Sequence, residues 1–424
     1  MKRVIVIGGG PAGLMAADVI ATAFGSGSGS VRVTLYERMP SVGRKLLMAG
    51  RGGLNLTHGE PLEMLLGRYG DARAFMDGVV GAFPPAALRA MAESLGQDTF
   101  VGSSGRVFPR AMKASPLLRA WLARLAGRGV EFRTRHTFVG FDEAGAALIA
   151  EKDEPALPVA ADAVVLALGG GNWPRLGSRG DWVPWLRQLG VAVHALQPAN
   201  AGVKVAWSEH FRDRFAGTPL KRIAVTIGNR RSRGEAVVTR DGLEGGAIYA
   251  LTPAVRHELA KGAATMLSVD LRPDLDHAEL VARLSRARGK QSVSAWLKKT
   301  LRLAPVAIGL VRDSAQNVLP KDPEGLARII KSVMLPVSGT GSLDRAISSA
   351  GGVVLGEVAA EMMVKSRPGL FVAGEMLDWE APTGGYLLQG CFATGHAAGR
   401  GVLGYLGLVP SAPVPKVLAS GASE

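Results

Sequence analysis

The fold is decided by the stretch Lys2-Arg3-Val4-Ile5-Val6-Ile7-Gly8-Gly9-Gly10-Pro11-Ala12-Gly13. Its first six residues are rich in β-branched side chains, which is typical of a strand buried on both faces of a parallel sheet. The next six form the pattern G-x-G-x-x-G, and an apolar helical stretch follows, from Leu14 to Phe24. Gly8 permits a tight turn, Gly10 lets the backbone approach a pyrophosphate, and Gly13 lets the helix pack on the strand. The start of this helix, which includes the predicted cofactor-binding residues Pro11 and Ala12, offers a partial positive charge to phosphates, and its first N–H groups beyond the proline are free to donate to them.

A second predicted strand, at residues 31–36, ends in an acidic residue, Glu37. A carboxylate at this position binds the ribose hydroxyls of a dinucleotide. Strand, glycine turn, helix and acidic residue occur together and in order, which predicts a dinucleotide site; a glycine turn without a ligand is the alternative. The Gly- and Ser-rich residues 25–30 are typical of a surface loop.

The residues after Glu37 distinguish one dinucleotide from another. A nicotinamide dehydrogenase would normally continue directly into its next helix, whereas here a long, basic, Gly-rich segment follows. Such a segment can run along an extended cofactor, with Arg44 and Lys45 near phosphate, and it favours FAD; a plain solvent loop is the alternative. The candidate cofactor-binding residues of this segment are Arg38, Gly43, Arg44, Lys45, Gly50, Arg51, Gly53 and Asn55.

The second half of the predicted site lies near the C-terminus, where a strand at 370–373 ends in Gly374-Glu375. A carboxylate there can accept hydrogen bonds from ribityl hydroxyls, and a helix starting near Gly385 aims N–H groups at the flavin O2/N1 region. A buried strand at 163–168 ends in close-approach glycines, and strands at 129–133 and 138–141 are predicted beside the adenine. These elements add Phe138, Gly169, Gly374, Glu375, Gly384, Gly385, Tyr386 and Leu387 to the predicted cofactor-binding residues.

Longer motifs are Gly43-Arg44-Lys45-Leu46 with Arg51–Thr57, Gly105–Pro109 with Lys113-Ala114-Ser115, Ala350–Val353, and Ala373–Asp378 with Pro382–Tyr386. In these motifs the chain resembles the HI0933-like (BaiN/YhiN) flavoproteins of the two-dinucleotide-binding-domain superfamily, over about residues 2–408. The resemblance implies an FAD-dependent oxidoreductase; family members are described as reductases of steroid-like enones, amine (aminoacetone) oxidases and reductases of uridine in ribosomal RNA. Leu54 stands where the family commonly has Cys and Leu387 where it has Asn, which suggests a distinct subfamily.

The predicted fold class is α/β, with a Rossmann-like FAD-binding domain around a parallel sheet that an insert interrupts. We place the two parts of this domain at 1–190 and 346–408, and a flexible tail at 409–424. The insert, 191–345, is expected to combine a β-barrel, about 191–252 and 335–345, with a helical subdomain at about 253–334. The predicted strands of the insert lie at 202–207, 223–227, 236–239 and 245–249, and its predicted helices at 253–262, 277–288, 291–301 and 323–334, with Thr252 and Asp322 as N-caps.

The positive charge of the chain is concentrated in this insert. The 424 residues include 50 Lys and Arg and 36 Asp and Glu, a net charge of +14. Residues 195–345 have 24 basic and 14 acidic side chains, or +10, which leaves 26 and 22, or +4, for the rest. Arg283, Arg286 and Lys290 are spaced i, i+3, i+7 and are expected to share a helix face. With Arg288 they are candidates for an RNA or polyanion footprint; a solvated helix face is the alternative.

Several classes of protein are excluded. The single cysteine, Cys391, excludes a disulfide framework and fits a reducing compartment. The seven histidines lack ligand spacing, so no metal site is predicted. No apolar run approaches the roughly 20 residues of a membrane span. We therefore expect a cytoplasmic protein without a membrane partner, and its oligomeric state stays open.

The leading hypothesis is an FAD-dependent oxidoreductase that reduces an activated C=C bond with electrons from NAD(P)H, with ribosomal RNA uridine as one candidate substrate. No second G-x-G-x-x-G follows a strand, so NAD(P)H is expected to dock transiently at the flavin face. Arg106 and Lys113 suit an anionic substrate or nicotinamide phosphates, and Tyr386 suits stacking or proton donation. The alternatives are a small-molecule amine oxidase that uses O2 and a non-catalytic, flavin-bearing RNA-binding factor. Candidates for lining the flavin face are Arg51, Arg106, Pro109, Lys113, Thr383 and Tyr386.

Overall fold

The computed structural model describes residues 1–23, 30–50, 52–152, 154–262 and 264–408. It divides into two compact units, the first made of Met1–Gln197 and Ser348–Glu424 and the second of Pro198–Ile347. Each unit has its own cluster of buried apolar side chains. The chain therefore leaves the first unit and returns to it, as in a domain that carries an insertion. Arg51 and the predicted tail at 409–424 lie outside the described residues.

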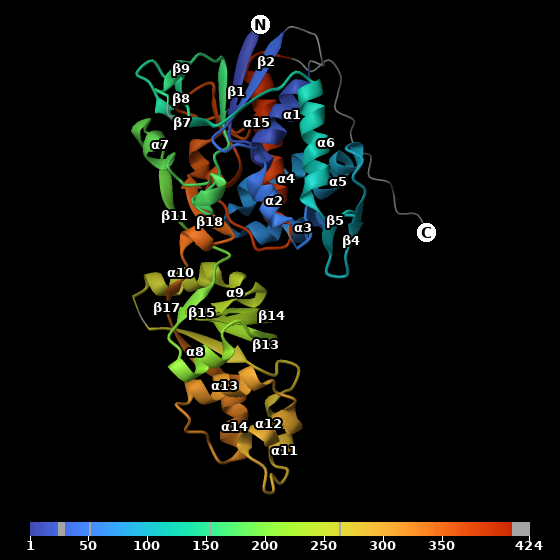
Figure 1. Cartoon of the computed structure of the whole chain (residues 1–424), viewed down its shortest axis with the longest axis vertical. Helices are drawn as coiled ribbons and strands as arrows, with labels where there is room; N and C mark the ends of the chain where they lie inside the picture. Colours follow the sequence, from blue (N-terminus) through green and yellow to red (C-terminus); the bar gives the residue numbers. More distant parts are fainter. Residues whose placement is uncertain (24–29, 51, 153, 263, 409–424) are drawn as a thin grey trace. The chain divides into compact units, whose positions relative to one another are not determined.

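A five-stranded parallel sheet forms the centre of the first unit, in the order β19-β10-β1-β2-β6 (Figure 1). β1 pairs with β10 on one side and β2 on the other, and its last four residues are buried, as its apolar run predicts. The carboxyl ends of parallel strands meet at one edge, so the segments that follow these strands are brought together. The strands are β1 (Lys2–Ile7), β2 (Val31–Glu37), β6 (Glu131–Thr134), β10 (Ala163–Leu166) and β19 (Leu370–Val372).

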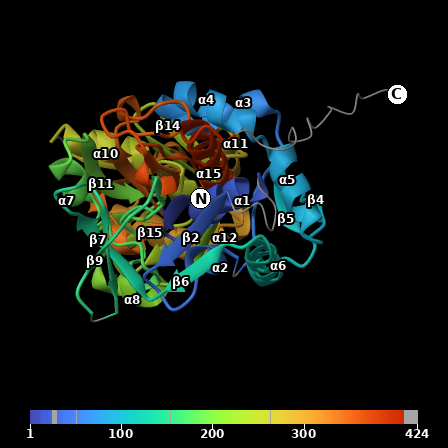
Figure 2. The ribbon, with the colours of Figure 1, turned by 90° about the horizontal axis from the view of Figure 1, so that it is seen from above.

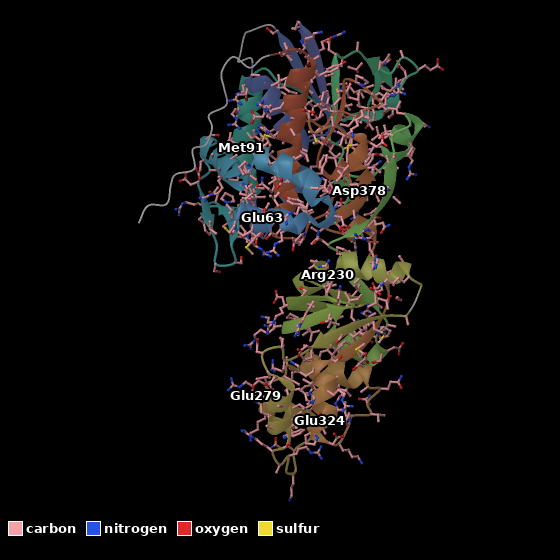
Figure 3. The ribbon with its side chains drawn as sticks, turned by 180° about the vertical axis from the view of Figure 1, so that it is seen from behind. Glu63, Met91, Arg230, Glu279, Glu324 and Asp378 are labelled. Carbon is pink, nitrogen blue, oxygen red and sulfur yellow. The ribbon has the colours of Figure 1, made fainter. Side chains whose placement is uncertain are left out.

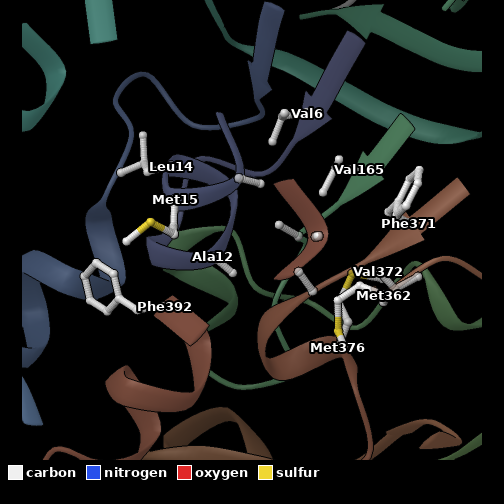
Figure 4. Close-up of a cluster of buried hydrophobic side chains, with 14 of the residues drawn as sticks. Val6, Ala12, Leu14, Met15, Val165, Met362, Phe371, Val372, Met376 and Phe392 are labelled. Atoms are coloured by element: carbon white, nitrogen blue, oxygen red, sulfur yellow. The ribbon is translucent and has the colours of Figure 1, made fainter. Parts of the chain in front are cut away.

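Two helices, α1 (Pro11–Thr22) and α15 (Tyr386–Tyr405), lie side by side in the first unit (Figure 2). Small residues let their backbones approach closely. A Cβ at Gly395 of α15 would lie 2.3 Å from the Ala12 carbonyl oxygen, and one at Gly399 would lie 2.7 Å from Val19 Cβ. Phe392 of α15 joins Leu14 of α1 in the buried cluster of Figure 4. Glycines of α15 thus allow this helix, near the end of the sequence, to pack closely on α1, near its beginning.

The remaining elements of the first unit surround this core. Three smaller sheets have the orders β7-β8-β9, β3-β5-β4 and β11-β18. The strands are β3 (Thr57–His58), β4 (Thr99–Val101), β5 (Arg106–Pro109), β7 (His136–Phe141), β8 (Ala147–Glu151), β9 (Leu157–Val159), β11 (Val193–Ala199) and β18 (Ser348–Val353). The helices are α2 (Arg44–Ala49), α3 (Leu62–Leu66), α4 (Arg73–Ala82), α5 (Pro85–Ser94), α6 (Ala114–Gly127) and α7 (Val183–Gln188), with 3-10 turns η1 (Gly67–Ala72), η2 (Pro174–Leu176), η4 (Leu355–Glu357) and η5 (Gly374–Met376).

The second unit is a closed antiparallel barrel with helices attached, in the strand order β12-β15-β14-β13-β16-β17. Together with the parallel sheet, this barrel confirms the predicted fold class. Helices α11 to α14 gather at one end of the barrel (Figure 1). In both units, none of the helices that the structure describes is long and apolar enough to cross a membrane.

The second unit has the following elements. The barrel strands are β12 (Val203–Val205), β13 (Pro219–Ile227), β14 (Arg230–Thr239), β15 (Gly242–Glu244), β16 (Thr265–Asp270) and β17 (Val333–Thr340). The helices are α8 (Glu209–Phe215), α9 (Gly246–Tyr249), α10 (Thr252–Ala260), α11 (His277–Leu284), α12 (Val293–Leu301), α13 (Pro305–Ser314), α14 (Pro323–Lys331) and the 3-10 turn η3 (Leu343–Arg345).

Some local predictions for this unit are wrong. Residues 245–249, expected as a strand, contain the short helix α9 (Gly246–Tyr249) with Gly245 as its N-cap. The adjacent Ala247 and Ile248 are both buried, whereas a strand would point them to opposite faces. The predicted helical range 253–334 also contains β16, a barrel strand. Leu251, not Thr252, is the N-cap of α10, since the Thr252 hydroxyl is bonded within the barrel connection to Ala201 and Tyr249. The Asp322 cap of α14 is confirmed, because its side chain accepts from the Gly325 N–H.

The basic helix face predicted from the spacing of Arg283, Arg286 and Lys290 is also wrong. Helix α11 ends at Leu284, so Arg286 and Lys290 lie beyond it. The Ser285 hydroxyl donates to the Val281 carbonyl (2.9 Å) and so satisfies one of the free carbonyls at the helix end. Arg283 pairs with Glu279 (2.6 Å), which Figure 3 labels on this helix. The basic residues at 286, 288 and 290 therefore lie on an exposed connection between α11 and α12.

The close packing of α1 and α15 predicts a stability difference between two glycines of one helix. We expect Gly395→Ala to destabilise the protein by about 1–3 kcal/mol, because the new methyl group overlaps backbone of α1. Gly404→Ala serves as the control, since a Cβ there would meet no described atom within 4 Å. Alanine there should be neutral or stabilising by up to about 1 kcal/mol, from helix propensity. The measurement is thermal unfolding of both variants; equal unfolding temperatures would contradict the packing argument.

Candidate functional site

Of the three glycines of the G-x-G-x-x-G motif between β1 and α1, two are closely packed and one faces open space. A Cβ at Gly8, where φ is +108°, would lie 2.2 Å from the Ala167 carbonyl oxygen, and one at Gly13 would lie 1.9 Å from the Gly8 carbonyl oxygen. A Cβ at Gly10 would meet no described atom within 4 Å. Its φ of −82° and ψ of −179° suit any residue. The turn is therefore held tightly against the sheet and leaves free space beside Gly10.

The N-terminus of α1 supplies hydrogen-bond donors next to this space. Gly10 is the N-cap, and the first helical hydrogen bond runs from Leu14 N to Gly10 O (2.9 Å). The N–H groups of Ala12 and Gly13 consequently have no acceptor within the helix, and Pro11 has no N–H. Free N–H groups and the positive end of the helix dipole attract an anion. The open space beside Gly10 and these donors together fit a pyrophosphate.

Glu37, at the end of β2, lies directly beside the glycine turn. Its Oε2 accepts a hydrogen bond from Gly9 N (2.9 Å) and its Oε1 accepts one from Met39 N (2.8 Å). Burial raises the pKa of this carboxyl group, and the two backbone N–H groups oppose the rise. The neighbouring Arg38 pairs with Asp181 (2.7 Å). The position of Glu37 suits the predicted ribose contact, which stays a prediction.

A polar network joins the segment after β2 to the segment after β19. Lys45 Nζ lies 2.6 Å from Glu375 Oε2 and 2.8 Å from Asn172 Oδ1. Ser349 donates its N–H to Glu375 Oε1 (2.8 Å), and its hydroxyl accepts from Gly171 N (2.9 Å). Segments from four distant parts of the sequence thus meet around one carboxylate at the carboxyl edge of the sheet.

Sequence reasoning missed Asn172 and Ser349. Asn172 directly follows the glycines at 169–171, and Ser349 directly precedes the Ala350–Val353 motif, so their proximity to recognised motifs was the available signal. The glycines themselves are constrained: Gly169 has φ +73°, and Gly374 has φ +79°, with its Cβ position 2.9 Å from Ala12 Cβ. Larger residues at Gly374 would push η5 away from α1.

The Gly-rich segment after Glu37 contains a buried acceptor without a partner. Gly43 is left-handed (φ 72°) and is the N-cap of α2, and Gly50 caps its C-terminus. Further along, Asn55 Oδ1 is buried and has no hydrogen-bond partner among the described residues. A buried acceptor left unpaired costs about 1–3 kcal/mol, so a ligand that donates a hydrogen bond there would be favoured. The open cradle at Gly10 and this atom are the two features that fit an extended dinucleotide.

A small sheet braces this segment from the other side. Leu54 N donates to Met112 O (2.9 Å), Leu56 N to Val107 O (2.9 Å) and Gly59 N to Gly105 O (2.7 Å). Pro109 is buried in this sheet, whereas Arg106 and Lys113 are exposed. Leu54, one of the two departures from the family pattern, is fully buried in the core. The motif Gly105–Pro109 therefore holds the Gly-rich segment after Glu37 in place, and Arg106 and Lys113 stay exposed beside it.

The N-terminus of α15 is packed onto the same segment. Gly385 (φ +98°) is its N-cap, and a Cβ there would lie 2.5 Å from the Thr57 carbonyl carbon. The Thr57 hydroxyl donates to Gln389 Oε1 (2.8 Å), so α15 is tied to β3. Gly384 also has positive φ (+134°), and Thr383 and Leu387 are half-buried. The helix predicted to start near Gly385 is observed, beginning at Tyr386.

Tyr386 belongs to a hydrogen-bonded cluster of titratable groups. Its hydroxyl donates to Glu60 Oε1 (2.7 Å), and Arg68 Nη2 lies 2.7 Å from Glu60 Oε2. The ring of His58 stacks on that of Tyr386 with centroids 5.3 Å apart. Burial, and then the hydrogen bond to Glu60, raise the pKa of Tyr386, whereas the hydrogen bond from Arg68 lowers the pKa of Glu60. The phenol thus stays protonated beside a carboxylate that stays ionised.

Phe138, a predicted cofactor-binding residue, and Cys391 both lie in packed surroundings. Phe138 on β7 is buried between Phe141 and Trp185, in edge contacts with centroids 5.1 and 5.0 Å apart, so its predicted adenine contact stays untested. Burial raises the pKa of the Cys391 thiol to about 12, which keeps it in the unreactive thiol form. Among the described residues, no group of three or more His, Cys, Asp or Glu is arranged to hold a metal ion.

Comparison with known proteins places these features in one family. The family model described as "HI0933-like protein Rossmann domain" matches residues 2–401. The 3-dehydro-bile acid delta(4,6)-reductase of Clostridium scindens is 27% identical over 94% of this chain and 98% of its own length. The ribosomal RNA dihydrouridine synthase of Escherichia coli is 24% identical over 94% of this chain and 97% of its own length.

A solved structure supports the fold. The 3-ketosteroid delta1-dehydrogenase of Sterolibacterium denitrificans, in complex with 1,4-androstadiene-3,17-dione, aligns with a TM-score of 0.53. The alignment covers 95% of this chain and 100% of that one at 12% identity, so the likeness concerns the fold alone.

The open space at Gly10 predicts a variant that folds normally but binds FAD poorly. In Gly10→Val the side chain projects into the space beside the free N–H groups of α1, where a Cβ meets no described atom within 4 Å. Loss of charge-assisted hydrogen bonds to a pyrophosphate, about 1.5–3 kcal/mol, corresponds to roughly 10- to 100-fold weaker FAD binding. Thermal unfolding of the FAD-free protein should stay unchanged.

The measurement is titration of the FAD-free protein with FAD, next to its unfolding temperature. Gly356→Val is the matched control, since a Cβ at Gly356 would also meet no described atom within 4 Å and the residue is exposed in η4. Equal FAD affinity of the two variants would show that Gly10 does not face the pyrophosphate.

Proposed function

The chain belongs to the HI0933-like family of FAD-dependent oxidoreductases, and on this premise we propose that it reduces a C=C bond conjugated to a carbonyl group, with electrons from NADH or NADPH. Similarity over nearly the full chain to two curated relatives carries the proposal. One relative is named as a reductase of an oxidised bile acid and the other as a synthase of dihydrouridine, so both names describe the addition of hydrogen to a double bond. The membership makes the chain an enzyme, which sets aside the non-catalytic alternative.

Bound FAD supplies the two-electron chemistry of such a reaction. The task of the chain is to hold the cofactor, to orient the substrate and to provide a proton. We propose that Gly10, Glu37, Lys45, Asn55 and Glu375 belong to the cofactor-binding set. The further residues proposed for it are Gly8, Pro11, Ala12, Gly13, Arg38, Gly43, Arg44, Gly50, Arg51, Gly53, Phe138, Gly169, Gly374, Gly384, Gly385, Tyr386 and Leu387.

Tyr386 is the proposed proton donor. Its raised pKa keeps the phenol protonated, and Glu60 and Arg68 hold the hydroxyl in one orientation. In the structure this hydroxyl donates to Glu60, so donation to a substrate requires an exchange of partner. Arg106 of β5 and Lys113, just before α6, are both exposed. We propose that they bind an anionic group of the substrate or of the nicotinamide cofactor.

Anaerobic stopped-flow absorbance tests the reaction in two halves. NADH or NADPH should bleach the flavin, and a cyclic enone, 2-cyclohexenone, should restore its colour. Tyr386→Phe should slow the second half by about 100-fold or more, which is typical of a lost general acid, and leave the first half unchanged.

Tyr405→Phe, in the same helix but exposed, is the matched control and should leave both halves unchanged. Absence of bleaching with either nicotinamide would overturn the reductase proposal. Rapid colour recovery with O2 and bleaching by an amine would favour the oxidase instead.

Uridine in ribosomal RNA is the second candidate substrate, and the charge of the second unit favours it. Residues 280–312 contain no Asp or Glu and eight basic side chains, at 283, 286, 288, 290, 298, 299, 302 and 312. Of these, the residues at 286, 288 and 290 are exposed on the connection between α11 and α12. Basic surfaces of this kind bind the phosphates of structured RNA.

A deletion strain tests this substrate directly. If the chain acts on ribosomal RNA, nucleoside analysis of ribosomal RNA from the deletion strain should show less dihydrouridine than the parent strain. Expression of the intact protein should restore the level, whereas expression of Gly10→Val should not. An unchanged dihydrouridine content, together with RNA binding that does not weaken with salt, would exclude ribosomal RNA.

A further inference from the structure

We propose that the second unit contains a binding pocket for an organic phosphate, separate from the dinucleotide site. A cavity of about 490 Å³ lies between α8, α12 and α13, and all of its lining residues belong to the second unit. Binding sites for small molecules typically measure roughly 300–1,000 Å³. The proposed function assigns nothing to this cavity, and the inference does not depend on the reaction at the flavin.

The floor of the pocket is apolar and firmly packed. Phe211 and Phe215 of α8 contact each other with ring centroids 5.2 Å apart, and Ile308 of α13 lies beside them. A Cβ at Gly309 would lie 2.4 Å from the ring of Phe215, so α8 and α13 are in direct contact here. The floor is therefore fixed in shape and can receive the carbon skeleton of a ligand.

Three permanently cationic side chains line the pocket, one from each helix. Arg214 of α8 has its guanidinium 5.6 Å from the centroid of the Phe215 ring. Arg312 of α13 donates through Nε to the Ser294 hydroxyl (3.3 Å), which leaves its remaining N–H groups for a ligand. Lys298 of α12 is exposed. Within the described residues, none of these three cations has a carboxylate within ion-pair distance.

One carboxylate, Asp313, lines the same pocket and does not neutralise these charges. It accepts a hydrogen bond from the hydroxyl of Ser208, the N-cap of α8. Three cations against one carboxylate leave an excess of positive charge around a concave surface. An anion bound there would be attracted by this net positive charge.

A phosphate group meets these conditions better than a neutral ligand. The planar fork of Arg312 or Arg214 matches phosphate oxygens, and a lysine contributes a point charge. The apolar floor would hold the organic part of the molecule. The same chemistry is available from a free mononucleotide and from a nucleotide within RNA, so the test includes both.

Isothermal titration of the full-length, FAD-saturated protein tests the proposal, since saturation with FAD fills the dinucleotide site. The probes are inorganic phosphate, UMP and an eight-nucleotide RNA. We expect UMP or the RNA to bind, and Lys298→Glu to weaken that binding roughly 10- to 100-fold, as expected when a charge-assisted contact becomes repulsive. Arg312→Gln should weaken it as well.

Lys321→Glu is the matched control, because Lys321 is an exposed lysine of the second unit that neither lines the cavity nor belongs to the basic stretch 280–312. Binding of UMP with a loss confined to the pocket variants identifies a free nucleotide as the source. Binding of the RNA alone, with the same loss, identifies RNA. Binding of neither UMP nor the RNA, or equal effects of Lys298→Glu and Lys321→Glu, overturns the pocket.

Discussion

The close approach of backbone segments around Ala12 is the constraint on which the first unit depends. Cβ positions at Gly374 and Gly395 would lie within 2.9 Å of Ala12 atoms, and one at Gly13 would lie within 1.9 Å of the Gly8 carbonyl oxygen. Only glycine fits at such distances, since a Cβ would overlap backbone at Gly13 and Gly395 and the Cβ of Ala12 at Gly374. This packing brings η5, with Glu375, and α15 to the glycine turn that begins the chain. The two halves of the proposed dinucleotide site are thus positioned by contacts within the protein.

Electrostatics differ between the two units, and the difference has a physical cause. In the first unit the charges of the site are satisfied internally: Glu375 is held by Lys45, and Glu60 by Arg68. Charges inside a folded unit need such partners, because an unpaired buried charge is costly. In the second unit the excess of +10 lies mainly on exposed side chains. These charges stay hydrated, and salt in the solvent screens the repulsion between them. A surface of this kind is suited to an external anion.

Sequence patterns predicted the first unit better than the second. The stretch Lys2–Gly13 predicted a strand, turn and helix, and all three are observed, because the pattern of apolar residues and glycines has one consistent interpretation. The second unit offers shorter signals. The strand expected at 245–249 is helix α9, since a short apolar run is compatible with either element until its packing partner is known. The helix expected to reach residue 288 ends at Leu284. Arg283, Arg286 and Lys290 therefore do not share a helix face, although their spacing would suit one.

The sequence by itself determined the fold class, the dinucleotide motif, the FAD preference and the family, because these depend on local spacing and residue type. Tertiary structure alone brought Asn172 and Ser349 to Glu375, bound Tyr386 to Glu60, and formed the cavity lined by Arg214, Lys298 and Arg312. These groups are far apart along the chain, and each is ordinary in its local sequence. Their chemistry arises from proximity, which depends on how the sheet edge, α15 and the three helices of the second unit pack.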